Sequence, residues 1–430
     1  MKYDRINKDL FIKNRANFVA AMAPKSVAIF NSNDIYPISA DSTMPFQQHR
    51  DIFHLSGVDQ EESILILFPD AHNEEHREML FLKETSELIA IWEGEKLTKE
   101  AAFETAGIKN VFWLDQLDTV LKIVMAQAEN IYINTNEHTR ANTIVETRED
   151  RFIKRLKADY PAHGFKKSAP IMHRLRSIKD SIEIELMQNA CNITEKGVRR
   201  ILSFIKPGVA EYEIEAELMH EFLRNRSKGF AYTPIIASGK NACVLHYIEN
   251  NQPCNDGDVI LMDFGAEYAN YASDLTRCVP VNGRFTARQK DVYNAVLNVK
   301  KASEKLLVPG TFLADYHVEV GKLMESELLG LGLIDQTDIK NQDPKWPAYK
   351  KYFMHGTSHY IGLDTHDLGL WTEPIKEGMA FTCEPGIYIP EESLGIRLED
   401  DLIVQASGGP FNLMGNIPIE ADEIEDLMNS

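Results

Sequence analysis

The stretch LMDFGAEYANYASDLTR, residues 261–277, decides how the second half of this chain is interpreted. It continues the apolar run 259–262 and places Asp263 at the end of that run, which predicts a buried strand that ends in a carboxylate. Asp274 follows eleven residues later, and a strand–turn–strand hairpin would bring both carboxylates to one side of a sheet. A lone buried charge is costly, so each carboxylate requires hydrogen bonds, a charged partner or a metal ion.

Four other segments of the second half also place acids or histidines beside turn residues. They are 238–247 (SGKNACVLHY) with His246, 354–367 (MHGTSHYIGLDTHD) with His355, His359 and His366, 381–388 (FTCEPGIY) with Glu384, and 395–401 (GIRLEDD) with Glu399. Glycines beside the histidines favour a loop that leads into a strand over a helix. Each residue alone has an ordinary explanation as a turn, a helix cap or a solvated side chain, and we interpret Asp400 and Asp401 as a solvated pair.

Taken together, these side chains point to metal chemistry. Acids that gather at strand ends would repel one another unless cations lie among them. Four carboxylates and one or two imidazoles suit a pair of divalent ions such as Mn²⁺, Co²⁺, Zn²⁺ or Fe²⁺, and oxygen-rich ligation favours Mn²⁺ over Zn²⁺. Bridging carboxylates can hold two such ions around a shared water and make that water more acidic.

The order and spacing of these segments resemble the metallopeptidase family with the pita-bread fold, and most closely aminopeptidase P, the Xaa-Pro aminopeptidases. The resemblance extends to the first half, where residues 40–57 (ADSTMPFQQHRDIFHLSG) are similar to a stretch typical of these enzymes. The chain departs from the usual residues of the family at Tyr360, at Thr365 and at 49–50. None of these positions is an expected ligand, so the departures bear on substrate preference.

The resemblance implies a role for each candidate residue. The expected ligands of two divalent metal ions are Asp263, Asp274, His359, Glu384 and Glu399. Of these, Asp274 and Glu399 would bridge the ions, and Glu384 would also transfer the proton of the bridging water. His246 and His366 are expected to bind substrate and to stabilise the tetrahedral intermediate, while a proline pocket would be lined by His355, Arg397 and Tyr232.

The implied activity is a dinuclear-metal aminopeptidase that cleaves the bond between the first residue of a peptide and a proline in second position. That bond is a tertiary amide without an N–H group, so recognition must come from the shape of the ring. The nearest alternative is a prolidase, which shares the ligands but splits Xaa-Pro dipeptides. A metal-free hydrolase of the creatinase type and a binding protein with the same fold but no catalysis are less consistent with a complete ligand set.

The chain is expected to divide near residue 172 into a smaller α/β domain, 1–172, and a pita-bread catalytic domain, 173–430. In the first part, strands are predicted at 26–31, 63–69, 79–84 and 131–133, with helices at 98–106 and 114–128. Residues 159–170 are interpreted as a linker. Residues 177–205 are predicted to form one long helix, with Ser177 and Asp180 as its capping pair.

The second part contains a weak internal repeat. Helical patterns end at Lys206-Pro207-Gly208 and again at Val308-Pro309-Gly310, an offset of 309 − 207 = 102 residues, and a further helix is predicted from near Glu211 and from near Leu313. Strand-like runs follow each helical pair. One interpretation is a duplicated α/β half whose copies face each other across a cleft, and the other is coincidence, because Pro-Gly commonly ends helices.

Composition excludes several classes of protein. The 430 residues include 46 Lys and Arg against 65 Asp and Glu, so the net charge is −19 and nucleic acid is not an expected partner. No apolar run approaches the ~20 residues of a membrane helix, and charges of both signs near the amino terminus do not fit a signal peptide. Five cysteines without a CxxC motif suit a reducing cytoplasm. The expected partners are proline-containing peptides and, from the resemblance, further copies of the chain in a homodimer or homotetramer.

Overall fold

The computed structural model describes residues 3–141 and 144–430. Within these ranges the chain forms two compact units. The first is Arg5–Arg176, and the second is Ser177–Ser430, to which Tyr3 and Asp4 also belong. The sequence-based division into domains 1–172 and 173–430 stays a prediction.

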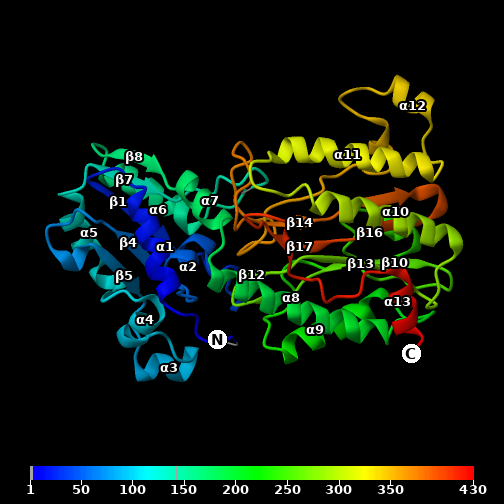
Figure 1. Ribbon diagram of the computed structural model, residues 1–430. Coiled ribbons are helices and arrows are strands. Elements are labelled where there is room, and N and C mark those ends of the chain that lie inside the picture. The colour runs from blue at the N-terminus through cyan, green and yellow to red at the C-terminus, as the bar shows by residue number, and fades with distance from the viewer. Residues whose placement is uncertain (1–2, 142–143) are drawn as a thin grey trace. The chain divides into compact units, whose positions relative to one another are not determined.

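The first unit is a layered α/β structure built on a six-stranded sheet (Figure 1). The strand order is β6-β5-β4-β1-β7-β8, in which β4 runs antiparallel to both of its neighbours and the other pairs are parallel. The sheet strands are β1 (Ser26–Asn31), β4 (Ile64–Leu67), β5 (Glu78–Leu82), β6 (Asn110–Trp113), β7 (Asn130–Ile133) and β8 (Gly164–Lys167), and a separate hairpin pairs β2 (Pro37–Ser39) with β3 (Ser42–Thr43). The four strands and the two helical regions predicted for this part of the chain are all present.

Helices cover both faces of this sheet because strand β1 is apolar on both faces. Val27 and Ile29 lie in a core formed with α5 (Leu117–Met125) and α6 (Arg148–Asp159). Ala28 and Phe30 lie in a second core formed with α1 (Asp9–Ala20), α2 (Arg50–Ser56), α4 (Lys99–Ala106) and α7 (Ala169–Ser177). A strand buried on both sides has the continuous apolar run seen in the sequence. Helix α3 (Glu87–Glu93) buries none of its residues.

The second unit places strands between two pairs of helices (Figure 1). Its helices are α8 (Ser181–Leu202), α9 (Glu211–Arg224), α10 (Ala287–Glu304), α11 (Leu313–Gly330), α12 (Gln336–Asn341) and α13 (Ala421–Met428). The strands of its first half are β9 (Ile235–Ser238), β10 (Val259–Phe264), β11 (Glu267–Tyr268), β12 (Tyr271–Ala272) and β13 (Leu275–Pro280). Those of its second half are β14 (Ala380–Cys383), β15 (Gly386–Ile389), β16 (Leu394–Arg397), β17 (Asp400–Ile403) and β18 (Phe411–Asn412).

The two halves of this unit begin in the same way, as the repeat predicts. Helix α9 begins at Glu211 and α11 at Leu313, each three residues after the glycine of a Pro-Gly pair. Gly208 has φ of 92° and Gly310 has φ of 94°. Residues other than glycine rarely adopt this left-handed backbone conformation, which explains why glycine follows proline at both sites. Antiparallel strands follow each helix pair, in the orders β13-β10-β9 and β14-β17-β18.

Two local predictions are wrong at the junction of the units. The long helix begins at Ser181 and not at 177, because Asp180 is extended and acts as the N-cap. Its carboxylate accepts a hydrogen bond from the backbone N–H of Ile182, while the Glu183 side chain accepts one from the N–H of Asp180. The predicted linker 159–170 is also largely ordered structure, since it contains edge strand β8 and the first residues of α7.

Candidate metal centre

The first two candidate ligands lie on neighbouring antiparallel strands. Strand β10 pairs with β13 so that Asp263 faces Thr276, and Asp274 immediately precedes β13. The hydroxyl of Tyr232 lies within hydrogen-bond distance of both carboxylates, 2.5 Å from Asp263 Oδ1 and also next to Asp274 Oδ1. Its single proton can serve only one of them at a time. The hairpin predicted from the sequence is therefore confirmed, and it brings the two carboxylates to the same side of the sheet.

His359 lies against two of the acids. Its Nε2 atom is 3.5 Å from Asp274 Oδ2 and 3.5 Å from Glu384 Oε1. Its other ring nitrogen, Nδ1, is 3.0 Å from the carbonyl oxygen of Tyr360. That contact favours the proton on Nδ1 and leaves the lone pair of Nε2 pointing to the carboxylates, as in a histidine that binds a metal.

The histidine segment is a loop that runs beside strand β14, as its glycines predicted. The N–H of Thr382 donates to the carbonyl of His359 at 3.0 Å, and the N–H of Glu384 donates to that of Thr357 at 2.8 Å. These two bonds fix the loop against the end of β14. They determine which side chains of the loop and the strand face each other, and the result is the contact of His359 with Glu384.

Glu399 completes the group from the second half of the unit. It forms an isolated antiparallel bridge with Thr276, whose hydroxyl donates to Glu399 Oε2 at 2.7 Å. Ligand atoms of Asp274, His359 and Glu399 all lie within 4.8 Å of one another. Asp263 is connected to this group through Tyr232 and Glu384 through His359, so the structure brings together all five side chains that the sequence singled out.

Burial and mutual repulsion raise the pKa values of Asp274, Glu384 and Glu399 in this group. Burial raises the pKa of Asp274 well above its usual range, and the charge of Asp263 adds to the effect. The pKa of Glu399 is also raised well above its usual range, first by burial and then by Asp274 and Glu384. Burial raises the pKa of Glu384 to about 7. Four acids with two carboxylate oxygens each, and one imidazole nitrogen, form a donor set that fits divalent cations and would lose this repulsion on binding them.

A hydrogen-bonded row of side chains borders the carboxylates. Arg397 donates through Nη2 to Asp263 and through Nη1 to the hydroxyl of Tyr388 at 2.8 Å. The same hydroxyl lies 2.8 Å from Nε2 of His355, whose Nδ1 is 3.8 Å from Glu384. Burial, with the charge of Arg397, lowers the pKa of His355 to about 3, so this imidazole is neutral. Sequence reasoning missed Tyr388, although it belongs to the motif 381–388 that contains Glu384.

The other two candidate histidines, His246 and His366, are exposed. His366 places its ring 4.5 Å from that of His359, at an interplanar angle of 71°. His246 follows the short helix η3 (Gly239–Cys243) and is close enough for its charge to lower the pKa of His355. Both therefore lie beside the carboxylate group on a side that solvent reaches, where a substrate could contact them.

The interpretation of Asp400 and Asp401 as a solvated pair is wrong. Both are buried, because β17 lies between β14 and β18 in its sheet. Asp400 pairs with Arg277 and with Lys300, and Asp401 accepts a hydrogen bond from the N–H of Asp274 at 3.0 Å. Arg277 stands in the stretch quoted first above, but nothing in the sequence connects Lys300 with this group.

Comparisons with known proteins agree with this geometry. A family model described as metallopeptidase family M24 matches residues 185–406, and one described as aminopeptidase P, N-terminal domain, matches residues 11–132. The chain is 33% identical to the Xaa-Pro aminopeptidase of Haemophilus influenzae, over 99% of this chain and 98% of that relative. It is also 33% identical to the Xaa-Pro aminopeptidase of Escherichia coli, over 98% of both chains.

Solved structures show the same similarity over the whole chain. Zn-substituted E. coli aminopeptidase P in complex with product has a TM-score of 0.87 and 31% identity, and the match covers 99% of each chain. Pseudomonas aeruginosa aminopeptidase PepP has a TM-score of 0.88 and 30% identity, over 99% of this chain and 98% of the other. The similarity therefore includes both units and is not confined to the residues around the carboxylates.

Proposed function

The chain belongs to metallopeptidase family M24, and from this premise we propose that it is an Xaa-Pro aminopeptidase. It removes the first residue of peptides that carry proline in second position. The observation that carries this proposal is the group of four carboxylates and His359, in a chain that matches relatives named Xaa-Pro aminopeptidase along almost its full length. Those relatives favour this activity over that of a prolidase.

Two divalent metal ions are the proposed cofactors, with Mn²⁺ as the expected metal and Co²⁺, Zn²⁺ or Fe²⁺ as alternatives. The proposed ligands are Asp263, Asp274, His359, Glu384 and Glu399. When bound, such ions polarise a carbonyl and make a water molecule more acidic. The protein side chains hold this site in a buried setting, since Asp274, His359 and Glu399 are each less than one tenth exposed.

Proton transfer is assigned to Glu384. Its carboxylate lies 3.5 Å from His359 and 3.8 Å from His355, and it is less buried than Asp274. It is therefore the acid of this group best placed to take a proton from the attacking water and to give it to the nitrogen that leaves. His246 and His366, on the exposed side, are proposed to bind the peptide and to donate to the oxyanion of the tetrahedral intermediate.

Recognition of proline is assigned to the row of side chains beside the carboxylates. His355 is held neutral and is oriented by Tyr388, which is in turn oriented by Arg397. A tertiary amide offers no N–H donor, so a rigid wall of rings can select the pyrrolidine by its shape. Tyr232, which contacts Asp263 and Asp274, is proposed to line the proline pocket together with His355 and Arg397.

A panel of four peptides under one metal condition tests the proposal. Arg-Pro-Pro should be cleaved fast. Acetyl-Arg-Pro-Pro should resist because the free amine is expected to bind near the metal ligands, and Arg-Ala-Pro should resist because alanine does not fill a pocket shaped for the ring. Ala-Pro should be poor, and a clear preference for this dipeptide would assign the chain to the prolidases.

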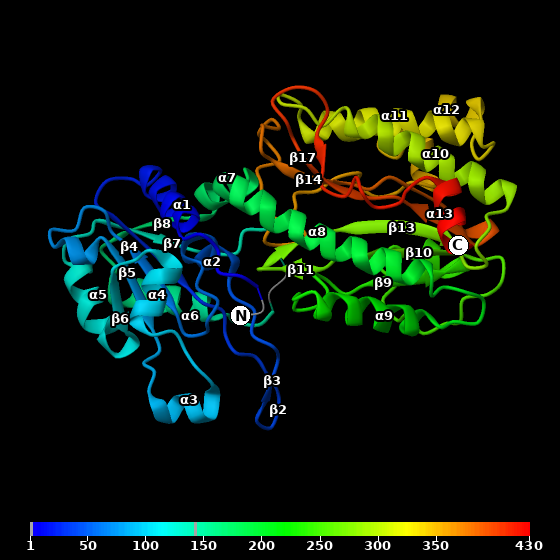
Figure 2. The same ribbon diagram turned by 60° about the horizontal axis from the view of Figure 1, so that its bottom comes forward.

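Self-association is proposed from two exposed apolar segments of the first unit. Ile91 and Trp92 of α3 are 77% and 83% exposed, and Ile38 and Met44 are exposed in and next to the β2–β3 hairpin. Figure 2 shows that both segments extend beyond the layered body of that unit. Large apolar side chains that gather on an exposed segment are typical of contact surfaces, and we propose a homodimer or homotetramer on this ground. Light scattering of the wild type and of a Trp92→Lys variant would test this.

The location and the partners of the protein are proposed from simpler observations. No helix among the residues that the structure describes is long and apolar enough to cross a membrane. All five cysteines are free, and we propose a reducing cytoplasmic location on that ground. Proline-containing peptides are the proposed partners, and a net charge of −19 argues against nucleic acid.

A further inference from the structure

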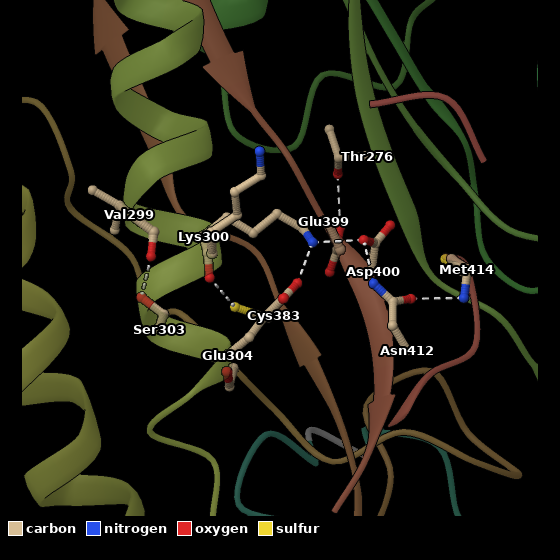
Figure 3. A network of polar contacts seen from close by, with 12 residues as sticks. Thr276, Val299, Lys300, Ser303, Glu304, Cys383, Glu399, Asp400, Asn412 and Met414 are labelled. Atoms are coloured by element: carbon tan, nitrogen blue, oxygen red, sulfur yellow. Dashed lines mark hydrogen bonds and ion pairs between the residues drawn. The ribbon is translucent and has the colours of Figure 1, made fainter. Parts of the chain in front are cut away.

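Behind the carboxylate group lies a second, separate set of buried charges. Asp400 occupies its centre and is 2% exposed (Figure 3). Its Oδ1 atom accepts a hydrogen bond from Nη2 of Arg277 at 2.6 Å, and its Oδ2 atom accepts from Nζ of Lys300 at 2.5 Å and from Nδ2 of Asn412 at 2.9 Å. Lys300 also pairs with Glu304 on the same helix, α10.

The charges of this rear network balance without a metal ion. Arg277 and Lys300 contribute two positive charges, and Asp400 and Glu304 contribute two negative charges. The carboxylate group in front differs, because among the residues that the structure describes Asp263, Asp274, Glu384 and Glu399 face only one guanidinium, that of Arg397. A divalent ion would therefore offset charge in front and not behind, which argues against Asp400 as a ligand despite its position next to Glu399.

Arg277 connects the rear network with the strands that carry the front group. One nitrogen of its guanidinium, Nη1, donates to the backbone carbonyl of Glu399 at 2.7 Å and to that of Thr276 at 3.0 Å. Its Nε atom donates to the carbonyl of Pro418 at 2.8 Å. The guanidinium is buried and planar, and it therefore fixes the relative positions of these carbonyls.

Hydrogen bonds hold both the backbone and the carboxylate of Glu399. Its N–H donates to the carbonyl of Thr276 at 3.1 Å, its carbonyl accepts from Arg277, and its carboxylate accepts from the Thr276 hydroxyl. The bridge between these two residues joins strand β13 of the first half of the unit to the residue that immediately precedes β17 in the second half. The orientation of the carboxylate is thus set by contacts that need no metal.

We propose that Arg277 and Asp400, with Lys300, are positioning residues that preorganise Glu399 for metal binding. The inference rests on the proposed metal site and adds residues to it that touch neither metal nor substrate. Partners behind a metal ligand commonly change metal affinity by about 10- to 100-fold when they are lost. Loss of the guanidinium fork should therefore weaken metal binding more than it changes the chemical step.

The test is a titration of the full-length, metal-free protein with Mn²⁺ by calorimetry. Arg277→Lys keeps the charge for Asp400 but loses the fork that holds the two carbonyls. We expect its Kd for Mn²⁺ to rise by about 10- to 100-fold, while turnover at saturating Mn²⁺ and the KM for Arg-Pro-Pro stay within a few-fold of the wild type. An unchanged Kd in folded Arg277→Lys would overturn the inference.

Two further variants separate positioning from plain stability. Val296→Ala, a buried position on the same helix as Lys300, should lower Tm without changing the Kd for Mn²⁺. If Arg277→Lys does not fold, Asn412→Ala removes one hydrogen bond to Asp400 from a less buried position and should raise that Kd several-fold, and a wild-type Kd there would equally overturn the inference. Failure of the wild type itself to bind Mn²⁺ would instead contradict the proposed function.

Discussion

Nε2 of His359 lies 3.5 Å from a carboxylate oxygen of Asp274 and 3.5 Å from one of Glu384. An imidazole nitrogen whose ring partner already donates to a backbone carbonyl has its lone pair free for these acids or for an ion between them. Such a histidine differs from His366, which stacks edge-on against the same ring but is exposed. The two neighbouring histidines therefore make a matched pair of variants.

His359→Ala should lose metal, and His366→Ala should keep it. Atomic spectroscopy of the purified variants should give about two ions per chain for His366→Ala, as for the wild type, and clearly fewer for His359→Ala. Turnover should fall in both variants, in the first because the metal site is incomplete and in the second because the oxyanion loses a donor. Equal metal loss in both would mean that the two roles are exchanged.

Glu384→Gln should keep the fold and lose turnover by at least about 10²-fold, which is the usual scale for a group that transfers a proton in the rate-limiting step. The amide retains the size of the carboxyl group and one oxygen that can bind a metal ion, but it cannot accept the proton. Kinetics with Arg-Pro-Pro and circular dichroism would measure the two effects. Glu377→Gln, at an exposed position nearby in sequence, is the matched control and should behave as the wild type. Turnover near that of the wild type in Glu384→Gln would remove this residue from the mechanism.

Local sequence signals were sufficient for the elements and for the ligand pairs that a single hairpin brings together. The apolar run before Asp263 predicted strand β10, and the turn after it predicted the contact with Asp274. The two Pro-Gly pairs predicted where α9 and α11 begin. Each of these signals depends on residues within about a dozen positions of one another.

Burial of Asp400 could not be predicted in this way. It depends on β17 lying between two other strands and on Arg277 and Lys300, which are 123 and 100 residues away in sequence. The start of α8 was missed for a different reason, since Ser177 and Asp180 both fit a capping position. The N–H of Ile182 donates to the Asp180 carboxylate and the N–H of Asp180 donates to the Glu183 side chain, and these hydrogen bonds decide between the two positions.

Stability of the first unit should depend on the protonation of Glu149. Burial raises the pKa of this acid to about 8, although Asn31 donates to it through its N–H and its side-chain amide. The folded state therefore binds a proton that the unfolded chain releases near pH 4.5, so this residue destabilises the fold increasingly as the pH rises from about 5 to 8. Glu149→Gln should raise Tm at pH 8 and change it little at pH 5, as calorimetry would measure. A Tm difference that is constant across this range would show that the carboxyl is not protonated in the fold.

Removal of metal should lower both activity and thermal stability, because Arg397 is then the one cation described beside the four acids, and they must repel one another or take up protons. An ion that binds only the folded state at 100 times its Kd stabilises it by about 2.7 kcal/mol, so the unfolding transition should fall by several degrees after exhaustive chelation. Readdition of Mn²⁺ should restore both properties, and Co²⁺ and Zn²⁺, added in turn, should restore stability even where they support turnover less well. Atomic spectroscopy must confirm the loss of metal before each assay. Full activity in a protein shown to be metal-free would mean that Glu384 and its neighbours act as acids and bases alone, and that the burial of four carboxylates is balanced by protons and not by cations.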